Sequence, residues 1–448
     1  MAIQVQIRAS ETHQKIESFG ASGAWWAQLV GGWPEATRTQ IIKLLFSKTE
    51  GVGVGAYRYN LGGGSKESGK GNFPNKNRSA SSFLREDGSY DWSRDAEAVW
   101  CLQEAVRQGA EEVVLFVNSP PERWTITGTA QGKIPFKANL KRKHELDFVQ
   151  YMLDVTEHFL ADGIPVRFIS PINEPFGPWI ARTGQEGCHY HPAGVRRLLR
   201  RFAQEMDRHP ALQNVLLSGA ENNDLRLMNK TYTRAVLDDP ILRKRVDGID
   251  VHGYVFKPLQ SLKGVKQRFR KYMDKRYPGV PIRLSEWTHM QGGRDYGMGS
   301  ALEQAKNMWE DLEILGVVSW QCWVAVSDVD FCDGLLYVDE DTQTYSIPKR
   351  YYAFGNFAKF LPRGAQRVGV ATPGAPASLQ SLAFTASGQT ILVFINHDTN
   401  SLELTLENPP TEAELFVTSE DKSLEPQRVQ TNAFTLPGRS VCTLVVKG

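Results

Sequence analysis

The sequence is poor in three features that define large classes of proteins: long apolar runs, a block of one charge, and paired cysteines. No apolar run approaches the ~20 residues that a membrane-spanning helix needs, so the sequence predicts no membrane partner. The first residues, "MAIQVQIRAS", lack the apolar centre of a secretion signal. This predicts a cytoplasmic protein, or a secreted one if a leader has been removed.

Charge and cysteine content exclude two further classes, nucleic-acid-binding proteins and disulfide-rich proteins. The 52 basic and 50 acidic side chains are scattered along the chain, and because no basic block stands out we expect no nucleic-acid partner. The five cysteines are odd in number and widely spaced, which is typical of reduced thiols and not of a disulfide framework. They are Cys101, Cys188, Cys322, Cys332 and Cys442.

Length and pattern predict a barrel with a smaller module. A chain of 448 residues, 41% hydrophobic, can hold a barrel of roughly 250 to 400 residues and a further domain. Short apolar runs alternate with stretches long enough for helices, which favours a parallel (β/α)8 barrel over an open doubly wound sheet. The eight runs expected to be strands are 18–26, 54–60, 112–118, 166–174, 214–221, 248–254, 281–287 and 317–323.

Two of the intervening stretches have a clear helical period, with apolar residues at three- and four-residue steps. In 140–161 these residues are Phe148, Met152, Val155 and Phe159. In 299–315 they are Leu302, Ala305, Trp309, Leu312 and Leu315.

After about residue 362 the pattern changes to short β-rich runs separated by Gly, Pro, Asn and Asp turns. This predicts an antiparallel β-sandwich. The first residues alternate like a strand, and we expect them to pair with that sheet. The predicted domains are therefore a catalytic barrel at 13–361 and a sandwich made of 1–12 and 362–448.

The carboxyl ends of the predicted strands carry many polar and aromatic side chains. In a parallel barrel these ends converge on one face, where active sites lie. Glu174 follows the fourth strand and Glu286 ends the seventh, so the two should face each other. The other candidates are Arg58, Asn60, Asn118, Trp124, Asn173, His252, Tyr254, Trp287, Trp320 and Trp323.

Two facing carboxyl groups are what a glycosidase needs, one to protonate the leaving oxygen and one to attack or to activate water. Sugar rings stack on indoles, and their hydroxyls bind Asn, Arg, His and Tyr. Five of the eleven tryptophans lie near strand ends, although each could equally be a core residue: Trp25, Trp26, Trp124, Trp320 and Trp323.

Two other motifs suggest different chemistry. "GSKESGKG" at 64–71 nearly matches a phosphate-binding loop, but Gly71 replaces the hydroxyl that binds magnesium. "CHYH" at 188–191 offers metal ligands without a second ligand pair, and we interpret it as a loop on the substrate side.

Six motifs, in order, resemble glycoside hydrolase family 30: "FGASGAWWA", "YRYNLGGGS", "NSPPERWT", "SPINEP" with "GQEGCHY", "VHGY" and "LSEW". The resemblance covers nearly the whole chain. It implies a retaining β-glycosidase without metal or cofactor, with Glu174 as the acid/base and Glu286 as the nucleophile. Arg58, Asn173 and Tyr254 would orient the nucleophile and the sugar, while His252, Trp124, Trp320 and Trp25 would line the pocket.

A retaining mechanism requires carboxyl groups about 5–5.5 Å apart. We expect Glu286 to stay ionised beside Arg58 and Tyr254, and Glu174 to begin protonated. The motifs look most like the galactanase branch, which implies β-linked galacto-oligosaccharides, of the β-1,6 kind. The alternatives are a β-glucosidase, β-xylosidase, β-fucosidase or β-glucuronidase, or a carbohydrate-binding protein without activity. The sequence does not indicate an oligomeric state.

Overall fold

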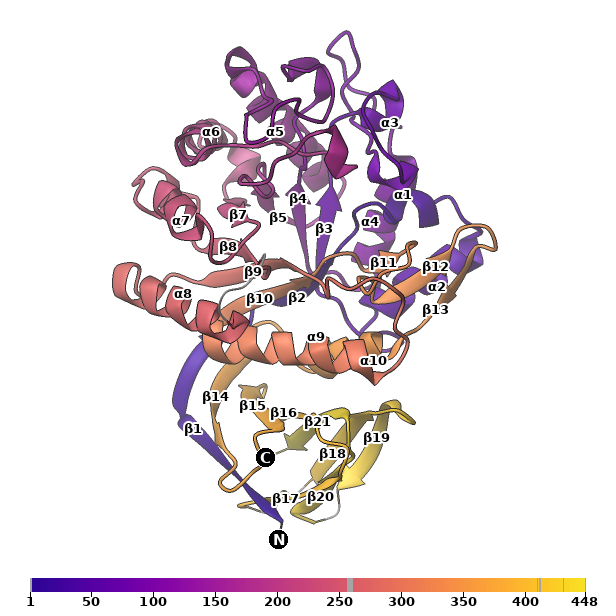
Figure 1. Ribbon diagram of the computed structural model, residues 1–448, viewed down its shortest axis with the longest axis vertical. Helices are drawn as coiled ribbons and strands as arrows, with labels where there is room; N and C mark the ends of the chain where they lie inside the picture. The colour runs from indigo at the N-terminus through magenta and orange to yellow at the C-terminus, as the bar shows by residue number, and fades with distance from the viewer. Residues whose placement is uncertain (1, 256–260, 409, 411, 430, 448) are drawn as a thin grey trace. The chain divides into compact units, whose positions relative to one another are not determined.

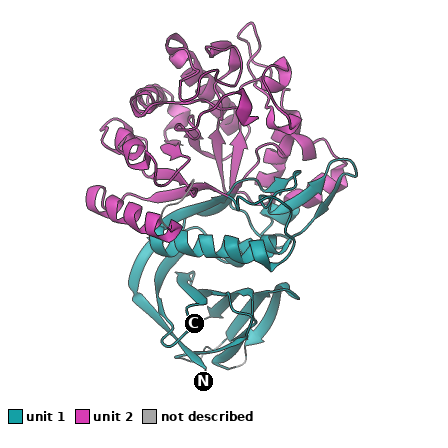
Figure 2. Cartoon of the chain, viewed as in Figure 1, with its two compact units in different colours: residues 1–20, 43–55, 288–448 teal, residues 21–42, 56–287 magenta. Residues whose placement is uncertain are grey.

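The computed structural model describes residues 2–255, 261–408, 410, 412–429 and 431–447. The chain forms two compact units, coloured separately in Figure 2. One consists of residues 21–42 and 56–287, and the other of residues 1–20, 43–55 and 288–448. Each unit is described by itself.

A nine-stranded sheet of TIM type confirms the expected (β/α)8 barrel (Figure 1). Its strand order is β6-β5-β4-β3-β2-β10-β9-β8-β7. The two ends of this order, β6 and β7, are consecutive in the chain, so the sheet returns to its starting point. The strands are β2 (Ser18–Ser22), β3 (Ala56–Asn60), β4 (Glu112–Phe116), β5 (Val166–Ser170), β6 (Leu216–Leu217), β7 (Ala220–Asn222), β8 (Ile249–His252), β9 (Ile282–Trp287) and β10 (Val317–Cys322).

The fifth predicted strand, 214–221, is broken in two. Ala220 and Glu221 have φ angles of 76° and 30°, a left-handed conformation that interrupts a strand. Gly219 between the two pieces donates its N–H to Asp250 Oδ2 at 2.9 Å. The uninterrupted strand expected from the sequence was therefore wrong, and the bend gives Glu221 an unusual setting.

Helices alternate with these strands. In α5 (Glu145–Ala161) the predicted apolar positions 148, 152, 155 and 159 are all buried. Glu145 and Asp147 lie in its first turn, where a negative charge stabilises the helix dipole. The other helices of this unit are α1 (Ala27–Val30), α3 (Ser65–Ser68), α4 (Ala96–Gln108), α6 (Pro192–Met206), α7 (Asn229–Leu237) and α8 (Leu262–Arg276), and α2 (Glu35–Phe46) begins in it.

In the second unit, the predicted helix at 299–315 is confirmed as α9 (Met298–Glu310) continued by a turn of π-helix at 311–315. The unit also contains α10 (Lys349–Ala358) and a small sheet of β11 (Val326–Ser327), β12 (Leu336–Asp339) and β13 (Thr344–Ser346). Within the described residues, no helix combines the length and apolarity needed to cross a membrane.

The C-terminal strands form the β-sandwich. β1 (Ile3–Lys15) pairs antiparallel with β14 and parallel with β17, as the alternation at the N-terminus predicts. The domain limits 13–361 and 1–12 with 362–448 stay a prediction. The strands after β13 are β14 (Gln366–Ala371), β15 (Leu379–Ala386), β16 (Gln389–Asn396), β17 (Leu402–Leu406), β18 (Glu412–Thr418), β19 (Ser423–Val429), β20 (Ala433–Leu436) and β21 (Ser440–Lys447).

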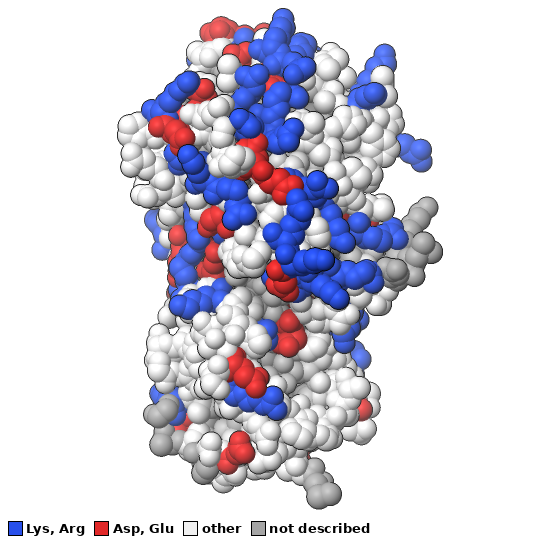
Figure 3. Space-filling view, turned by 90° about the vertical axis from the view of Figure 1, so that its left-hand side faces the viewer, with Lys and Arg blue, Asp and Glu red and all other residues white. Residues whose placement is uncertain are grey.

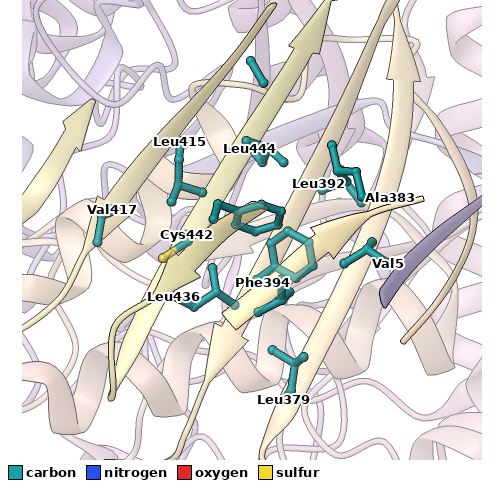
Figure 4. Packing of buried hydrophobic residues seen from close by; sticks show 14 of the residues in the cluster. Val5, Leu379, Ala383, Leu392, Phe394, Leu415, Val417, Leu436, Cys442 and Leu444 are labelled. Carbon is teal, nitrogen blue, oxygen red and sulfur yellow. The ribbon is translucent and has the colours of Figure 1, made fainter. Parts of the chain in front are cut away.

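Alternate side chains of these strands enclose one apolar cluster, which we call the sandwich core (Figure 4). Phe394 is fully buried at its centre, with its ring 5.7 Å from that of Phe434. All five cysteines of the chain are buried free thiols, and one of them, Cys442, belongs to the sandwich core.

Candidate active site

Five ionisable side chains at or just after the carboxyl ends of barrel strands form one cluster, which we call the charged cluster. They come from five different strands of the sheet or the loops that follow them. Parallel register brings them together, because the carboxyl ends of such strands lie at one face; His252, for example, pairs directly with Glu286. The members are Arg58, Glu174, Glu221, His252 and Glu286.

Arg58 holds the cluster together. One of its terminal nitrogens donates to Glu286 Oε2 at 2.8 Å, and the other donates to Glu221 Oε2 at 2.7 Å and Asn173 Oδ1 at 2.8 Å. The guanidinium is fully buried. Burial opposes its charge, but the carboxylates of Glu221 and Glu286 outweigh burial and raise the pKa of Arg58. A buried cation of this kind needs such partners, so the side chain is fixed in place.

A row of amides continues from Arg58 along the strand ends. Asn173, which accepts from Arg58, donates its own amide to Asn118 Oδ1 at 3.0 Å. Asn118 in turn donates to Asn60 Oδ1 at 3.1 Å. The row fixes the amide orientation of Asn173 and presents polar groups of the kind that bind sugar hydroxyls.

His252 lies among three carboxylates. Its Nδ1 is 2.9 Å from Glu174 Oε1 and 3.4 Å from Glu286 Oε1, and its Nε2 is 3.6 Å from Glu221 Oε2. Burial alone would favour the neutral ring. The charge of Glu286 and the hydrogen bonds to Glu174 and Glu221 outweigh burial and raise the pKa of His252 to about 10. The ring is therefore an imidazolium at neutral pH that donates to Glu174.

Glu286 differs from the expectation for a simple ionised nucleophile. Arg58 and His252 favour its charged form, and Tyr254 donates to its Oε1 at 3.3 Å. Burial and the carboxylates of Glu174 and Glu221 outweigh them and raise the pKa of Glu286. Two cations thus face three carboxyl groups within the charged cluster.

The backbone of Glu174 is held in an unusual conformation. Its φ angle is 45°, and its N–H donates to the carbonyl of Glu221 at 3.0 Å. Its own carbonyl accepts from Gly177 N–H at 2.9 Å and from the indole N–H of Trp179 at 2.8 Å. These three bonds offset the cost of a left-handed non-glycine residue, which is about 1–3 kcal/mol.

Trp179 owes its position to two glycines. A Cβ atom at Gly177 would lie 2.3 Å from the indole ring, and one at Gly187 would lie 2.5 Å from it. Any larger residue at either position would displace the ring. The loop that follows β5 is thus built around Trp179, which contacts the backbone of Glu174.

The structure brings six of the nine predicted site residues together: Arg58, Asn173, Glu174, His252, Tyr254 and Glu286. It does not do so for the tryptophans. Trp124 packs on Tyr151 and His144, and no contact among the described residues joins it to the charged cluster. Trp25 stacks beneath the guanidinium of Arg78, 4.6 Å away. Trp320 belongs to the other unit, where it is fully buried and donates to Asp311 Oδ2 at 2.9 Å.

Sequence reasoning missed Glu221. Burial raises the pKa of the Glu221 carboxyl. The charge of Arg58 and the imidazole of His252 outweigh burial and lower this pKa to about 2. The signal was present, because Glu221 ends a predicted strand just as Asn60 and Glu286 do. Its neighbours, "SGAENN", match no motif that drew attention to it.

Glu174, His252 and Glu286 also offer one possible metal ligand each, with the three ligand atoms within 4.8 Å of one another. A metal ion would require a neutral imidazole, so it would have to displace the proton that the neighbouring carboxylates favour on His252.

Facing glutamates at the carboxyl end of a TIM-type barrel define the site of a glycoside hydrolase. Comparison with known families agrees. The model of O-Glycosyl hydrolase family 30 matches residues 2–239, and the glycosyl hydrolase family 30 beta sandwich domain matches residues 364–444. The chain belongs to glycoside hydrolase family 30, and it is a glycoside hydrolase that acts on carbohydrate.

Individual relatives are distant. An endo-beta-1,6-galactanase of Hypocrea rufa is 24% identical over 78% of this chain and 73% of its own length. A conserved exported protein of Bacteroides fragilis has a TM-score of 0.90 at 22% identity, covering all of both chains. The catalytic domain of a family 30 xylanase C from Talaromyces cellulolyticus has a TM-score of 0.78 at 17% identity, covering 99% of this chain and all of its own. At these identities the solved structures establish the fold alone.

Proposed function

We propose that this protein is a retaining β-glycosidase that cleaves β-linked galacto-oligosaccharides, of the β-1,6-linked kind. Glu286 attacks the anomeric carbon, and Glu174 protonates the leaving oxygen and then deprotonates water. Arg58 and Tyr254 orient Glu286, Asn173 binds a sugar hydroxyl, and His252 donates to Glu174. Glu221 acts through Arg58 and His252 as a positioning residue.

The observation that carries the mechanism is the closeness of the two carboxyl groups. Ligand oxygens of Glu174 and Glu286 lie within 4.8 Å of each other. Retaining enzymes need a separation of about 5–5.5 Å, whereas inverting enzymes need about 6.5–9.5 Å to admit a water molecule. The 4.8 Å limit joins one oxygen of each group, and the separation of the whole carboxyl groups is somewhat larger; this closeness supports direct attack by one carboxylate.

The place of Arg58 supports the division of roles. Double displacement begins with one carboxyl group protonated and one ionised. Arg58 donates to Glu286 at 2.8 Å, so this cation favours negative charge on the proposed nucleophile and opposes the burial that raises the pKa of Glu286.

Support for galactose as the substrate comes from a relative and not from the geometry of the site. The Hypocrea rufa protein is named an endo-beta-1,6-galactanase, while the Talaromyces structure is named a xylanase. A β-xylosidase, β-glucosidase, β-fucosidase or β-glucuronidase is the alternative. One hydroxyl separates galactose from glucose, and a single polar partner in the pocket can enforce that choice.

The test is incubation with β-1,6-galactobiose, galactotriose and galactotetraose beside matched β-1,6-gluco- and β-1,4-xylo-oligosaccharides. We expect galactose-containing products whose first-formed anomer, followed by proton NMR, is β. Turnover of only the glucan or xylan series would overturn the substrate and leave the mechanism intact. A first-formed α anomer would overturn the retaining mechanism whichever sugar is cleaved.

A further inference from the structure

A strongly basic segment lies within the barrel. Residues 192–276 contain nineteen Lys and Arg against nine Asp and Glu, whereas the rest of the chain has an excess of acidic residues. The cations of this segment form no contiguous basic block, because they are spread over 85 residues. Folding gathers many of them on three consecutive helices.

Figure 3 shows Lys and Arg side chains gathered on the side where α6, α7 and α8 lie in Figure 1. We call the exposed cations of these helices and of η6 (Leu242–Lys244) the basic face. They are Arg196, Lys230, Arg234, Arg243, Lys244, Lys263, Arg268, Lys271, Lys275 and Arg276.

Much of this charge has no intramolecular partner. Arg234 and Arg276 share Asp238. Six other cations of the basic face form no ion pair with any residue that the structure describes: Arg196, Arg243, Lys244, Lys263, Lys271 and Lys275. If this surface served folding alone, we would expect more carboxylates beside these six cations.

Helix stability accounts for only part of this charge. Arg234 in the last turn of α7, and Lys275 and Arg276 in the last turn of α8, lie where a cation stabilises the helix dipole. Lys263 lies in the first turn of α8, where a cation is unfavourable, and none of α6, α7 and α8 has an acidic residue in its first turn. The excess of unpaired cations is therefore open to explanation by a ligand.

We propose that the basic face binds an acidic polysaccharide, a chain bearing a carboxylate on its sugar units. The carboxylates would lie along the exposed cations of α8. Such binding would hold the hydrolase on a matrix that also contains its substrate. The proposal rests on the glycoside hydrolase assignment and not on the choice of galactose.

Nucleic acid is the competing polyanion, and the face lacks what single strands require. Successive bases stack on exposed aromatic rings. The aromatic side chains of α6, α7 and α8 in the described structure are buried, except Tyr272, which lies 5.1 Å beneath the ammonium of Lys230. A row of cations without rings suits carboxylates better than the bases of a single strand. A duplex binds through its phosphates without such rings, so the experiment must distinguish it.

The test is isothermal titration of the full-length protein with oligogalacturonate of about ten units, beside neutral β-1,6-galactotetraose. The variant is the triple Lys263→Gln, Lys271→Gln, Lys275→Gln on α8. The matched control removes three equally exposed cations outside the segment, Lys133→Gln, Lys137→Gln and Arg182→Gln. Neither variant alters the charged cluster, and an unchanged thermal unfolding midpoint reports that both are folded.

We expect oligogalacturonate affinity to fall about tenfold in the α8 variant and to stay within about twofold in the control, because each exposed ion pair that is lost weakens binding by about twofold. Binding should also disappear in 0.5 M salt, where exposed charges are screened. Absence of binding at 50 mM salt, or equal losses in both variants, would overturn the proposal. Tighter binding of a 20-base-pair DNA duplex, lost in the α8 variant, would assign the face to nucleic acid instead. These readouts need no turnover, so they stand apart from the galactan test.

Discussion

The charged cluster and the sandwich core are both buried, yet they are held together by opposite means. The cluster packs two cations against three carboxyl groups, each costly to bury and tolerated only because its partners are present. The sandwich core contains only apolar side chains and a thiol, which gain free energy from burial without any exact partner. The difference predicts that changes in the cluster reduce kcat whatever their effect on stability, whereas changes in the core reduce stability and leave kcat per folded molecule unchanged.

The largest effect should come from Glu286→Gln, which removes the proposed nucleophile and keeps the volume. We expect kcat on an aryl β-glycoside to fall by about 10⁴-fold or more, as for other nucleophile deletions. Because Arg58 keeps Glu221 as a partner, the thermal unfolding midpoint should change little. Retention of a tenth of the activity would show that Glu286 is not the nucleophile.

Glu174→Ala should have the next largest effect, about 10²–10⁴-fold, the usual contribution of general acid–base catalysis. Azide should restore turnover of a dinitrophenyl glycoside, since azide attacks without a base and the leaving group needs no acid. The product should be a β-glycosyl azide, identified by NMR. An α-azide, or no rescue, would contradict the assigned role.

The converse change is Phe394→Ala in the sandwich core, with Phe394→Leu as its milder control. We expect the free energy of unfolding to fall by about 3–5 kcal/mol for the alanine variant, because a fully buried ring leaves a cavity. The kcat per folded molecule should be unchanged at low temperature. A large loss of kcat with normal stability would break the contrast between the two regions.

Glu221→Gln should affect both properties. A pKa held at about 2, below the ordinary 4.5, means that Glu221 stabilises the fold above pH 4.5 and loses this contribution as pH falls through about 2. Urea unfolding at pH 2–5 should therefore depend less on pH in the variant, and kcat should fall with the orientation of Arg58. Identical pH dependence in both proteins would exclude Glu221 from the network.

The smallest effect should come from Trp179→Phe, which removes one hydrogen bond to the carbonyl of Glu174 and keeps the ring between the two glycines. We expect about a fivefold loss of kcat on substrates with poor leaving groups, which need the acid, and little change on dinitrophenyl glycosides. Equal losses on both would indicate general damage to the loop.

The sequence predicts what depends on pattern and fails where position depends on backbone detail. Strand ends and motif order were enough to find Glu174, Glu286 and their partner Arg58. The left-handed conformations at Ala220, Glu221 and Glu174 leave no trace in composition, so the broken strand and the role of Glu221 were not predicted.

The tryptophans and the basic face need a different kind of information. A tryptophan near a strand end satisfies the same pattern whether it lines a pocket or packs in the core, so the pocket roles of Trp25, Trp124 and Trp320 stay a prediction. The cations of α6, α7 and α8 form no block in the sequence because helical spacing and chain folding bring them together only in three dimensions.

The five buried thiols have a practical consequence. A thiol reagent cannot react with any of them until the surrounding structure opens, so the rate of labelling at each cysteine measures how often that part of the chain opens. Cys442 lies within the sandwich core, while Cys101 lies on α4 of the barrel. The labelling rates of these two cysteines therefore report the local opening of two separate parts of the chain. Mass spectrometry can measure both rates without an engineered cysteine.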